Sequence, residues 1–208
     1  MKRWLIFLFI TGLAAACSHP VERLPVYGKT TIVGEDTLHS VVRPFSFINQ
    51  DSIEITNHSF ESRIYVTDFI FLSCPSICPI MTQQLKRVYE MYRTDPNVFF
   101  LSHTIDPEND TIPRLKAYTE DLGIDSDKWF FVTGDKDSIF SIANDSYFAT
   151  AFADSTAPGG FIHSGAFLLI DTHRQIRGAY DGTDPVEAER LMDDIQILLA
   201  EEFPQQYK

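Results

Sequence analysis

The sequence is poor in cysteine: its 208 residues include only Cys17, Cys74 and Cys78. Three cysteines cannot form a disulfide framework. They also argue against a structural zinc site, which takes four protein ligands. If Cys17 is modified, as argued below, all remaining thiol chemistry belongs to Cys74 and Cys78.

Positive charge is also scarce, with 17 lysines and arginines against 29 acidic residues and a net charge of −12. Removal of Lys2 and Arg3 with a leader peptide would leave 15 basic residues and a net charge of −14. A surface this acidic repels the phosphates of nucleic acids. The composition therefore predicts no nucleic-acid partner.

Long apolar runs are missing beyond the first residues. The uncharged run 4–16 follows Lys2 and Arg3, ends in three alanines and directly precedes Cys17. It is too short to span a bilayer, which needs about 20 residues. The pattern predicts a signal peptide of the lipoprotein type over 1–16, with Cys17 lipidated. An ordinary cleaved signal or a short anchor is the alternative, and every reading places the folded part outside the cytoplasm. We expect the periplasmic side of the cell envelope, with the membrane bound through the lipid anchor.

Residues 18–40 are predicted to form a flexible tether, since they contain two prolines and two glycines and show little apolar periodicity. Apolar residues become steady from about residue 41. The remaining segment, 41–208, is long enough for one domain with its own core.

Strand and helix patterns alternate along this domain. We expect a hairpin over 45–55, strands at 64–72, 98–105 and 129–133, helices at 79–94, 110–122 and 138–143, an irregular loop over 144–162, a hairpin over 166–180, and a last helix begun by Asp184, Pro185 and Glu187 as a capping box. The order is that of a thioredoxin-like α/β fold with an N-terminal β-hairpin and a long loop insertion before the last hairpin. Order alone leaves other α/β folds open.

Cys74 and Cys78 lie where a buried strand gives way to a helix. A helix N-terminus carries partial positive charge and free N–H groups, which stabilise a thiolate. The i, i+4 spacing lets both sulfurs share one ion, and soft thiolates favour Cu(I) and zinc over hard cations. The alternatives are two buried thiols or a structural disulfide. Met81 follows the apolar face of the helix and is predicted to lie in the core.

A third ligand is sought at the end of the irregular loop, where His163 stands before the next strand. A lone histidine in a loop is more often structural or solvated, so position alone does not assign it. The other histidines are predicted to be surface residues: His19, His39, His58, His103 and His173.

Four blocks, in order, resemble the Sco/SenC family. They are the strand and C-P-x-x-C-P segment 69–79, the S-x-D-P-x-x-D-T-P-like segment 102–113, Trp129 with Thr133-Gly134, and the segment 163–171, which begins with His-Ser and ends with Leu-Ile-Asp as in the family and has Phe167 where a tyrosine is common. The resemblance implies a thioredoxin-like fold. It also implies that Cys74, Cys78 and His163 bind copper, preferably Cu(I) and also Cu(II).

The family resemblance further implies a metallochaperone that delivers copper to the dinuclear copper site of cytochrome c oxidase. The partners would be the copper-site subunit of the oxidase and a copper donor protein. A thiol-disulfide oxidoreductase that uses Cys74 and Cys78 as a catalytic redox pair to reduce the oxidase's copper-ligand cysteines remains an alternative, as does a copper or redox sensor. The three residues between the cysteines, instead of the two usual in thioredoxin-type enzymes, favour delivery over turnover.

Overall fold

A computed structural model describes residues 23–34, 36–153 and 161–207. The predicted leader, Cys17 and the tether residues 18–22 lie outside the described residues. Among those that are described, no helix combines the length and the apolar character that crossing a membrane requires.

A seven-stranded sheet forms the centre of the domain, in the order β11-β10-β5-β6-β7-β3-β4. Strands β5, β6 and β7 run parallel in the middle, and every other pairing is antiparallel. The strands are β3 (Ser46–Asn49), β4 (Glu54–Thr56), β5 (Ile64–Ile70), β6 (Val98–Thr104), β7 (Trp129–Thr133), β10 (Ala166–Ile170) and β11 (Ile176–Asp181). The three parallel strands are buried throughout, which explains their nearly continuous apolar sequences.

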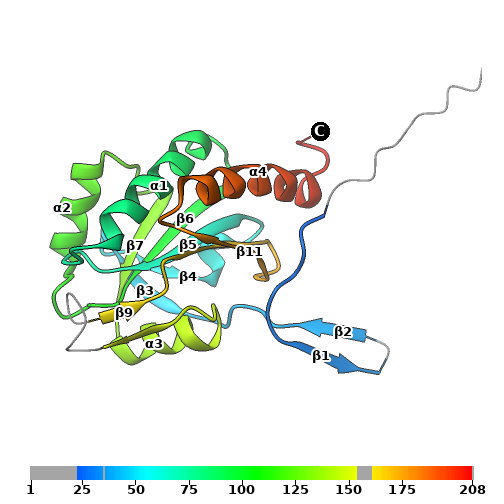
Figure 1. The fold of residues 1–208 in the computed structure, drawn as a ribbon, viewed down its shortest axis with the longest axis horizontal. Coiled ribbons are helices and arrows are strands. Elements are labelled where there is room, and N and C mark those ends of the chain that lie inside the picture. Colours follow the sequence, from blue (N-terminus) through cyan, green and yellow to red (C-terminus); the bar gives the residue numbers. More distant parts are fainter. Residues whose placement is uncertain (1–22, 35, 154–160, 208) are drawn as a thin grey trace, which may run out of the picture.

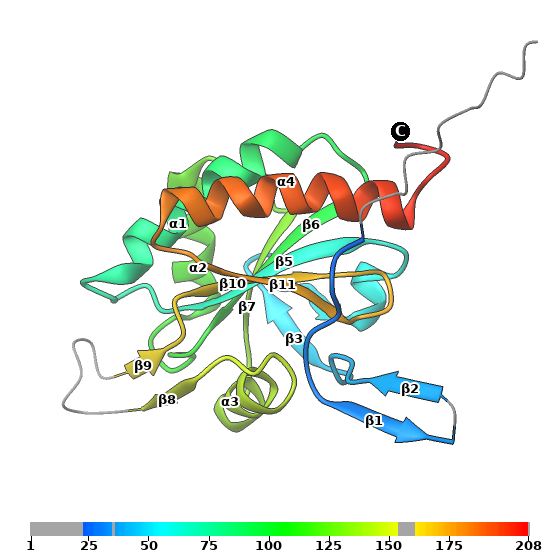
Figure 2. The same cartoon turned by 45° about the vertical axis from the view of Figure 1, so that its right-hand side comes forward.

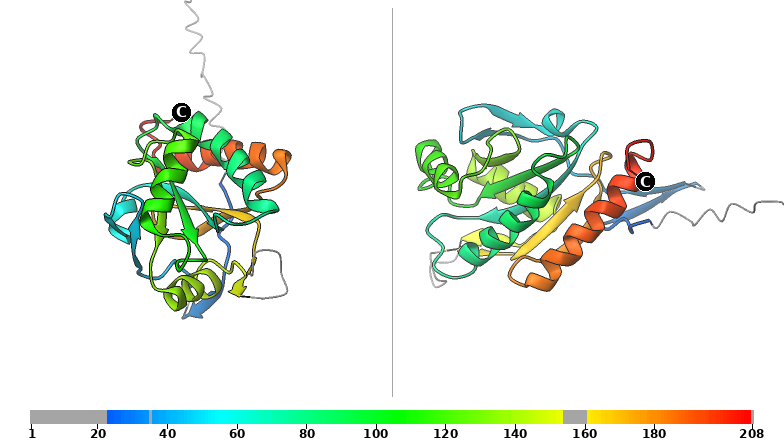
Figure 3. Two further views of the ribbon diagram at one scale, coloured as in Figure 1. Left: turned by 90° about the vertical axis from the view of Figure 1, so that its left-hand side faces the viewer. Right: turned by 90° about the horizontal axis from the view of Figure 1, so that it is seen from above.

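Helices cover both faces of this sheet (Figure 1). The helices are α1 (Ile77–Tyr92), α2 (Ile112–Leu122), α3 (Lys136–Asp145) and α4 (Pro185–Glu202), with a short 3-10 helix at Asn57–Phe60. α1 and α4 lie side by side over one face (Figure 3), and α3 lies on the other. The apolar repeat of α1 faces the sheet, since Met81, Leu85 and Val88 are fully buried.

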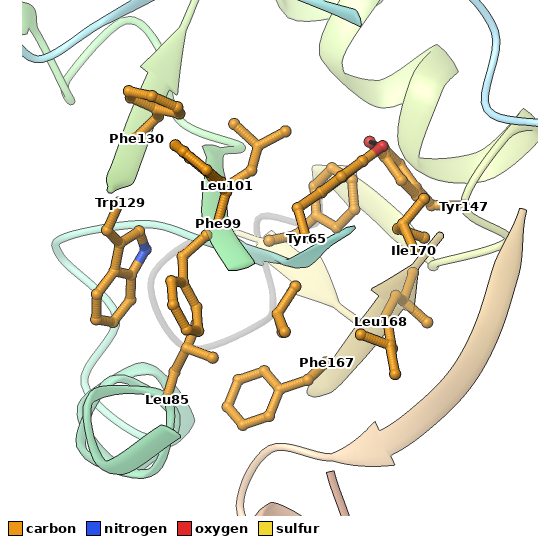
Figure 4. Packing of buried hydrophobic residues seen from close by; sticks show 14 of the residues in the cluster. Tyr65, Leu85, Phe99, Leu101, Trp129, Phe130, Tyr147, Phe167, Leu168 and Ile170 are labelled. Atoms are coloured by element: carbon orange, nitrogen blue, oxygen red, sulfur yellow. Dashed lines mark hydrogen bonds between the residues drawn. The ribbon is translucent and has the colours of Figure 1, made fainter. Parts of the chain in front are cut away.

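Large aromatic side chains fill both layers of the core (Figure 4). Under α1, Tyr89 packs against Phe100 and Trp129, with ring centroids 5.7 and 5.6 Å apart. On the opposite face, the hydroxyl groups of Tyr65 and Tyr147 meet at 3.1 Å, so each buried phenol has a polar partner. The hydrophobic core therefore has one layer on each face of the sheet, and the central strands are packed from both sides.

Most predicted elements are confirmed within a few residues, but two segments differ. The predicted tether contains a hairpin, β1 (Thr30–Val33) with β2 (Asp36–His39), that projects from the body of the domain (Figure 2). The predicted irregular loop contains a second hairpin, β8 (Ala151–Ala153) with β9 (Phe161–His163). Such short strands give too few alternating positions for a pattern to reveal them.

The prediction that His103 is a surface residue is wrong. His103 is fully buried in the middle of β6, its ring stacked on Phe69 at 5.0 Å and flanked by Phe45, Phe47 and Tyr147. Neither ring nitrogen has a hydrogen-bond partner among the described residues, and burial lowers the pKa of His103 to about 3. The ring acts as an aromatic core residue.

The remaining histidines differ in their exposure. His58 and His173 are exposed, as predicted, whereas His39 is half-buried at the end of β2. His19 lies outside the described residues. None of these histidines lies among the predicted ligands.

Candidate metal centre

The structure brings Cys74, Cys78 and His163 together, although His163 lies 85 residues beyond Cys78. Their ligand atoms, the two Sγ atoms and one ring nitrogen, lie within 4.8 Å of one another. Both cysteines are free thiols. The Cys78 Sγ and the His163 Nε2 are 3.4 Å apart. Metal bonds of 2.0–2.3 Å, as zinc makes to such ligands, span about this distance across one ion, so the donors fit a single soft metal.

The cysteines occupy the turn between β5 and α1, as the sequence predicts. Cys74 lies before the helix, where its N–H donates to the Phe71 carbonyl at 3.1 Å, and Cys78 lies in the first turn. Pro79 is the third residue of α1, where the absent N–H breaks no helical hydrogen bond. The backbone N–H groups of Ser76 and Cys78 hydrogen-bond the Cys74 sulfur.

The two thiols differ in how readily they ionise. Burial opposes ionisation of Cys74, but hydrogen bonds from the backbone and side chains of Cys78 and Ser76 outweigh it and lower the pKa of Cys74. Burial raises the pKa of Cys78, and the neighbouring Cys74 sulfur adds to the rise despite an opposing backbone hydrogen bond at Phe71. Cys74 is therefore the thiolate that forms first, whether the partner is a metal or a disulfide.

The β8–β9 hairpin carries His163 to the site. His163 pairs with Ala151, and the next residue, Ser164, donates its N–H to the Thr150 carbonyl at 2.7 Å. The His163 Nδ1 lies 3.1 Å from the Ser164 carbonyl oxygen, an arrangement that puts the ring proton on Nδ1. Nε2 then keeps its lone pair, which is the form that binds a metal. Burial also lowers the pKa of His163, which favours the neutral ring.

Phe71 packs against the His163 imidazole, and Phe161 packs against Phe71. The Phe71 ring meets the His163 ring edge-on at 5.7 Å, and the two phenylalanine rings are 5.3 Å apart. The imidazole thus has an aromatic neighbour at Phe71, while its Nε2 faces the Cys78 sulfur at 3.4 Å.

Asp110 is a supporting residue whose role sequence reasoning missed. Its fully buried carboxylate accepts the Leu72 N–H at 3.0 Å and the Thr104 hydroxyl at 2.6 Å. Arg114 pairs with the same carboxylate at 3.4 Å and reaches the Ser73 hydroxyl at 3.5 Å. Asp110 thus holds Leu72 directly and Ser73 through Arg114. Asp110 belongs to the S-x-D-P-like segment, so the motif marked it as a residue of interest. The spacing of the motif could not show that it accepts the Leu72 N–H.

Asp68 is a second buried acid near the pair. Its carboxylate accepts the Ser102 hydroxyl at 2.6 Å, and Ser102 accepts the Trp129 indole N–H at 2.9 Å. Burial raises the pKa of Asp68 to about 7, against the lowering by Ser102. The negative form of Asp68 in turn helps to raise the pKa of Cys78.

The fold and the site define a thioredoxin-like protein with a dithiol and an imidazole gathered at the end of a central strand. The SCO1/SenC family model matches residues 34–200. The chain belongs to the SCO1/SenC family.

Known relatives support this assignment. The SCO1 protein homologue of Bacillus subtilis is 26% identical over 163 residues, which cover 78% of this chain and 84% of the relative. A SCO1/SenC family lipoprotein from Bacillus anthracis is 26% identical with a TM-score of 0.70, covering 76% of this chain and 95% of its own.

Two further structures share the fold. BsSco is described as having a disulfide switch and as a member of the Sco family of cytochrome c oxidase assembly proteins. It is 27% identical with a TM-score of 0.68, and the match covers 76% of this chain and 93% of BsSco. Arabidopsis thaliana ScoI, solved with copper bound, is 22% identical with a TM-score of 0.63, and the match covers 80% of this chain and 99% of ScoI. The predicted thioredoxin-like fold is confirmed.

Proposed function

We propose that this protein carries copper, preferably Cu(I), on Cys74, Cys78 and His163 and delivers it to the dinuclear copper site of cytochrome c oxidase during assembly. The observation that carries the proposal is the gathering of two thiols and a correctly oriented Nε2 within 4.8 Å. The copper bound in Arabidopsis thaliana ScoI supports it.

The chemistry of the donors suits a carrier. Two sulfurs and one imidazole make a three-coordinate site, which holds Cu(I) and still lets an incoming ligand approach. Cys74 ionises first and can take the ion, and Cys78 loses its proton as the second bond forms, since metal binding releases thiol protons. The recipient would be the copper-site subunit of the oxidase, and a copper donor protein would load the site.

The proposal includes a lipid anchor at Cys17 and a place on the periplasmic side of the membrane. The export pattern over 1–16 supports it, and the lipoprotein relative from Bacillus anthracis is consistent with it. Radiolabelled palmitate supplied to cells would enter the wild-type chain and not a Cys17→Ser variant. Labelling of both chains would contradict lipidation at Cys17.

An anaerobic Cu(I) titration of the reduced protein against a competing chelator tests copper binding. We expect one tightly held copper per chain. Cys74→Ser or Cys78→Ser should abolish tight binding, since one thiolate cannot retain the ion. His163→Ala should weaken binding by at least about tenfold, or about 1.4 kcal/mol, since one of the three metal bonds is lost. Met81→Leu is the control, since Met81 is a fully buried core residue. Full affinity in either serine variant would exclude the dithiolate site.

Thiol-disulfide exchange is the second candidate function. The unequal cysteines favour it, because a lowered pKa at Cys74 marks an attacking thiol. The disulfide switch of BsSco is consistent with it. Equilibration with glutathione buffers would measure the reduction potential of the pair. Weak copper binding with fast, repeated reduction of a model disulfide would favour this function over delivery.

A further inference from the structure

The chain is held against the domain well before the folded core begins. The Leu24 N–H donates to the Glu201 carboxylate at 3.3 Å, near the end of α4. Arg177 of β11 donates to the Leu24 carbonyl at 2.7 Å and to the Pro25 carbonyl at 3.2 Å. Three hydrogen bonds thus fix a two-residue segment that the sequence predicted to be flexible.

The same segment also pairs with the edge of the sheet. The Tyr27 N–H donates to the Ile176 carbonyl at 2.8 Å, forming a β-bridge to β11. The Leu24 side chain packs against the hydrophobic core. Residues 24–27 are therefore held by backbone pairing, apolar contact and charge together.

Arg177 depends on this segment for part of its hydrogen bonding. Its guanidinium is buried and pairs with Asp171 at 3.2 Å and Glu201 at 2.8 Å. The Leu24 and Pro25 carbonyls accept its remaining inward donors. Release of the segment would break these two charge-assisted hydrogen bonds, which opposes release.

The segment lies at the end of the sheet opposite to the thiols. Ile176 pairs with Ile170, and Ile170 pairs with Tyr65 at the start of β5. Cys74 follows the far end of β5, and seven strand residues span about 20 Å. In Figures 1 and 2 the dark-blue start of the described chain passes β11 near the end of α4, whereas β9 lies at the opposite end of the molecule.

We propose that residues 24–27 form a latch that closes the tether onto the domain and keeps the thiol end turned away from the membrane. The orientation relative to the membrane depends on the lipid anchor proposed at Cys17. Seven residues from Cys17 to Leu24 reach at most about 25 Å. With the latch open, the next fixed points are the base of the β1–β2 hairpin, where Ser40 bonds Lys29, and the buried Val42. The reach then about doubles, to roughly 50 Å.

Limited trypsin digestion of the full chain tests the latch itself. Arg23 and Lys29 are exposed and flank it. Glu201→Ala removes the acceptor of Leu24 and one partner of Arg177, and Tyr27→Pro removes the bridging N–H. We expect cleavage at Arg23 and Lys29 to become about tenfold faster in both variants, since cleavage follows the open population.

Glu189→Ala is the matched control, because Glu189 lies on the exposed side of the same helix and pairs with Arg87. It should leave the cleavage rate unchanged. Wild-type cleavage as fast as that of a free peptide of residues 18–34, or unchanged rates in both latch variants, would overturn the latch.

A pair of maleimides tests the orientation on vesicles. The acylated, reduced, metal-free chain is treated with a maleimide fixed to a lipid headgroup and, separately, with the same maleimide in solution. The lipid-linked reagent should modify Cys74 slowly in the wild type and about fivefold faster in Glu201→Ala, as a longer reach raises the effective concentration near the membrane. The soluble reagent should react equally with both.

Equal rates for wild type and variant with the lipid-linked reagent would overturn the orientation. A chain that does not sediment with the vesicles would disprove the lipid anchor instead. The trypsin result would still decide whether the latch exists, so the two failures are distinguishable.

Discussion

The buried side chain of His103 has no hydrogen-bond partner in the part of the chain that the structure describes, which makes its protonation costly. Its pKa in the folded protein is about 3, against an ordinary value of 6.5. Between these values the unfolded chain binds a proton that the folded chain does not. The free energy of unfolding therefore falls as the pH drops below 6.5, by up to about 1.4 kcal/mol per pH unit from this residue.

His103→Phe tests this residue, since phenylalanine fits an aromatic cage and cannot titrate. We expect the variant to lose the His103 contribution to the pH dependence and to be at least as stable at pH 7. Urea unfolding at pH 6.5 and 4.5 measures it. Asp68, whose pKa is raised from 3.8 to about 7, contributes with the opposite sign over the whole of this range, so the slope of the variant must be compared with that of the wild type. Equal slopes in the two proteins would contradict the argument, and His58→Phe at an exposed position is the control.

Asp110 acts on the metal centre through the backbone. Asp110→Ala leaves the half-buried Leu72 N–H and the buried Thr104 hydroxyl without their acceptor. We expect a loss of stability of about 2–6 kcal/mol, at about 1–3 kcal/mol for each of the two orphaned groups, and weaker Cu(I) binding because the residues before Cys74 lose their position. Asp110→Asn keeps one acceptor oxygen and should restore part of the copper affinity.

Chelator competition for Cu(I) and urea unfolding together check the role of Asp110. Asp121→Ala, on the exposed side of α2, is the control. If Asp110→Ala lost stability but kept full copper affinity, the residue would support the fold alone.

At the scale of the element, the start of α4 distinguishes a full capping box from a helix cap made by Asp184 alone. The sequence predicts a capping box of Asp184 and Glu187, but only half of it is found. The Asp184 carboxylate accepts the Val186 N–H at 2.9 Å, whereas Glu187 forms an ion pair with Arg190. Asp184→Ala should therefore cost about 1 kcal/mol of stability, and Glu187→Ala about 0.5 kcal/mol or less, as for an exposed pair. Chemical denaturation of both variants measures these losses. Equal losses of stability would show that Glu187 takes part in capping as the sequence predicts.

The elements that could be predicted are those whose pattern is long. The strands β5, β6 and β7 and the helix α1 have continuous apolar runs or a repeating apolar face, so burial and sequence agree. The hairpins β1–β2 and β8–β9 consist of strands of three or four residues, and their pairing is decided by tertiary contacts. The same limit explains His103, since a histidine in a central strand takes the environment of the strand.

The three side chains of the candidate site could be predicted from the sequence, but the contacts that hold them in place could not. The spacing of Cys74 and Cys78 and the family-like segment around His163 pointed to the three side chains that the structure gathers. The tautomer of His163 and the hold of Asp110 on Leu72 depend on contacts between segments far apart in the chain. No local pattern encodes such contacts.

At the scale of the whole molecule, copper would join segments that the chain keeps far apart. The thiols belong to the β5–α1 turn and the imidazole to β9, across 85 residues. An ion bound to all three donors of the folded protein, and poorly to the unfolded chain, stabilises the fold by mass action. Loading with Cu(I) at about a thousand times its dissociation constant should raise the free energy of unfolding by about 4 kcal/mol.

Oxidation gives the matched comparison for this linkage, because a Cys74–Cys78 disulfide has no thiolate to offer. Thermal unfolding of the reduced protein should shift upwards on addition of Cu(I), and the oxidised protein should show no such shift. Removal of copper with a chelator should return the reduced protein to its metal-free transition. Stabilisation of fully oxidised protein by copper would place the ion elsewhere, whereas a smaller shift in His163→Ala than in the wild type would assign part of the linkage to the β8–β9 hairpin.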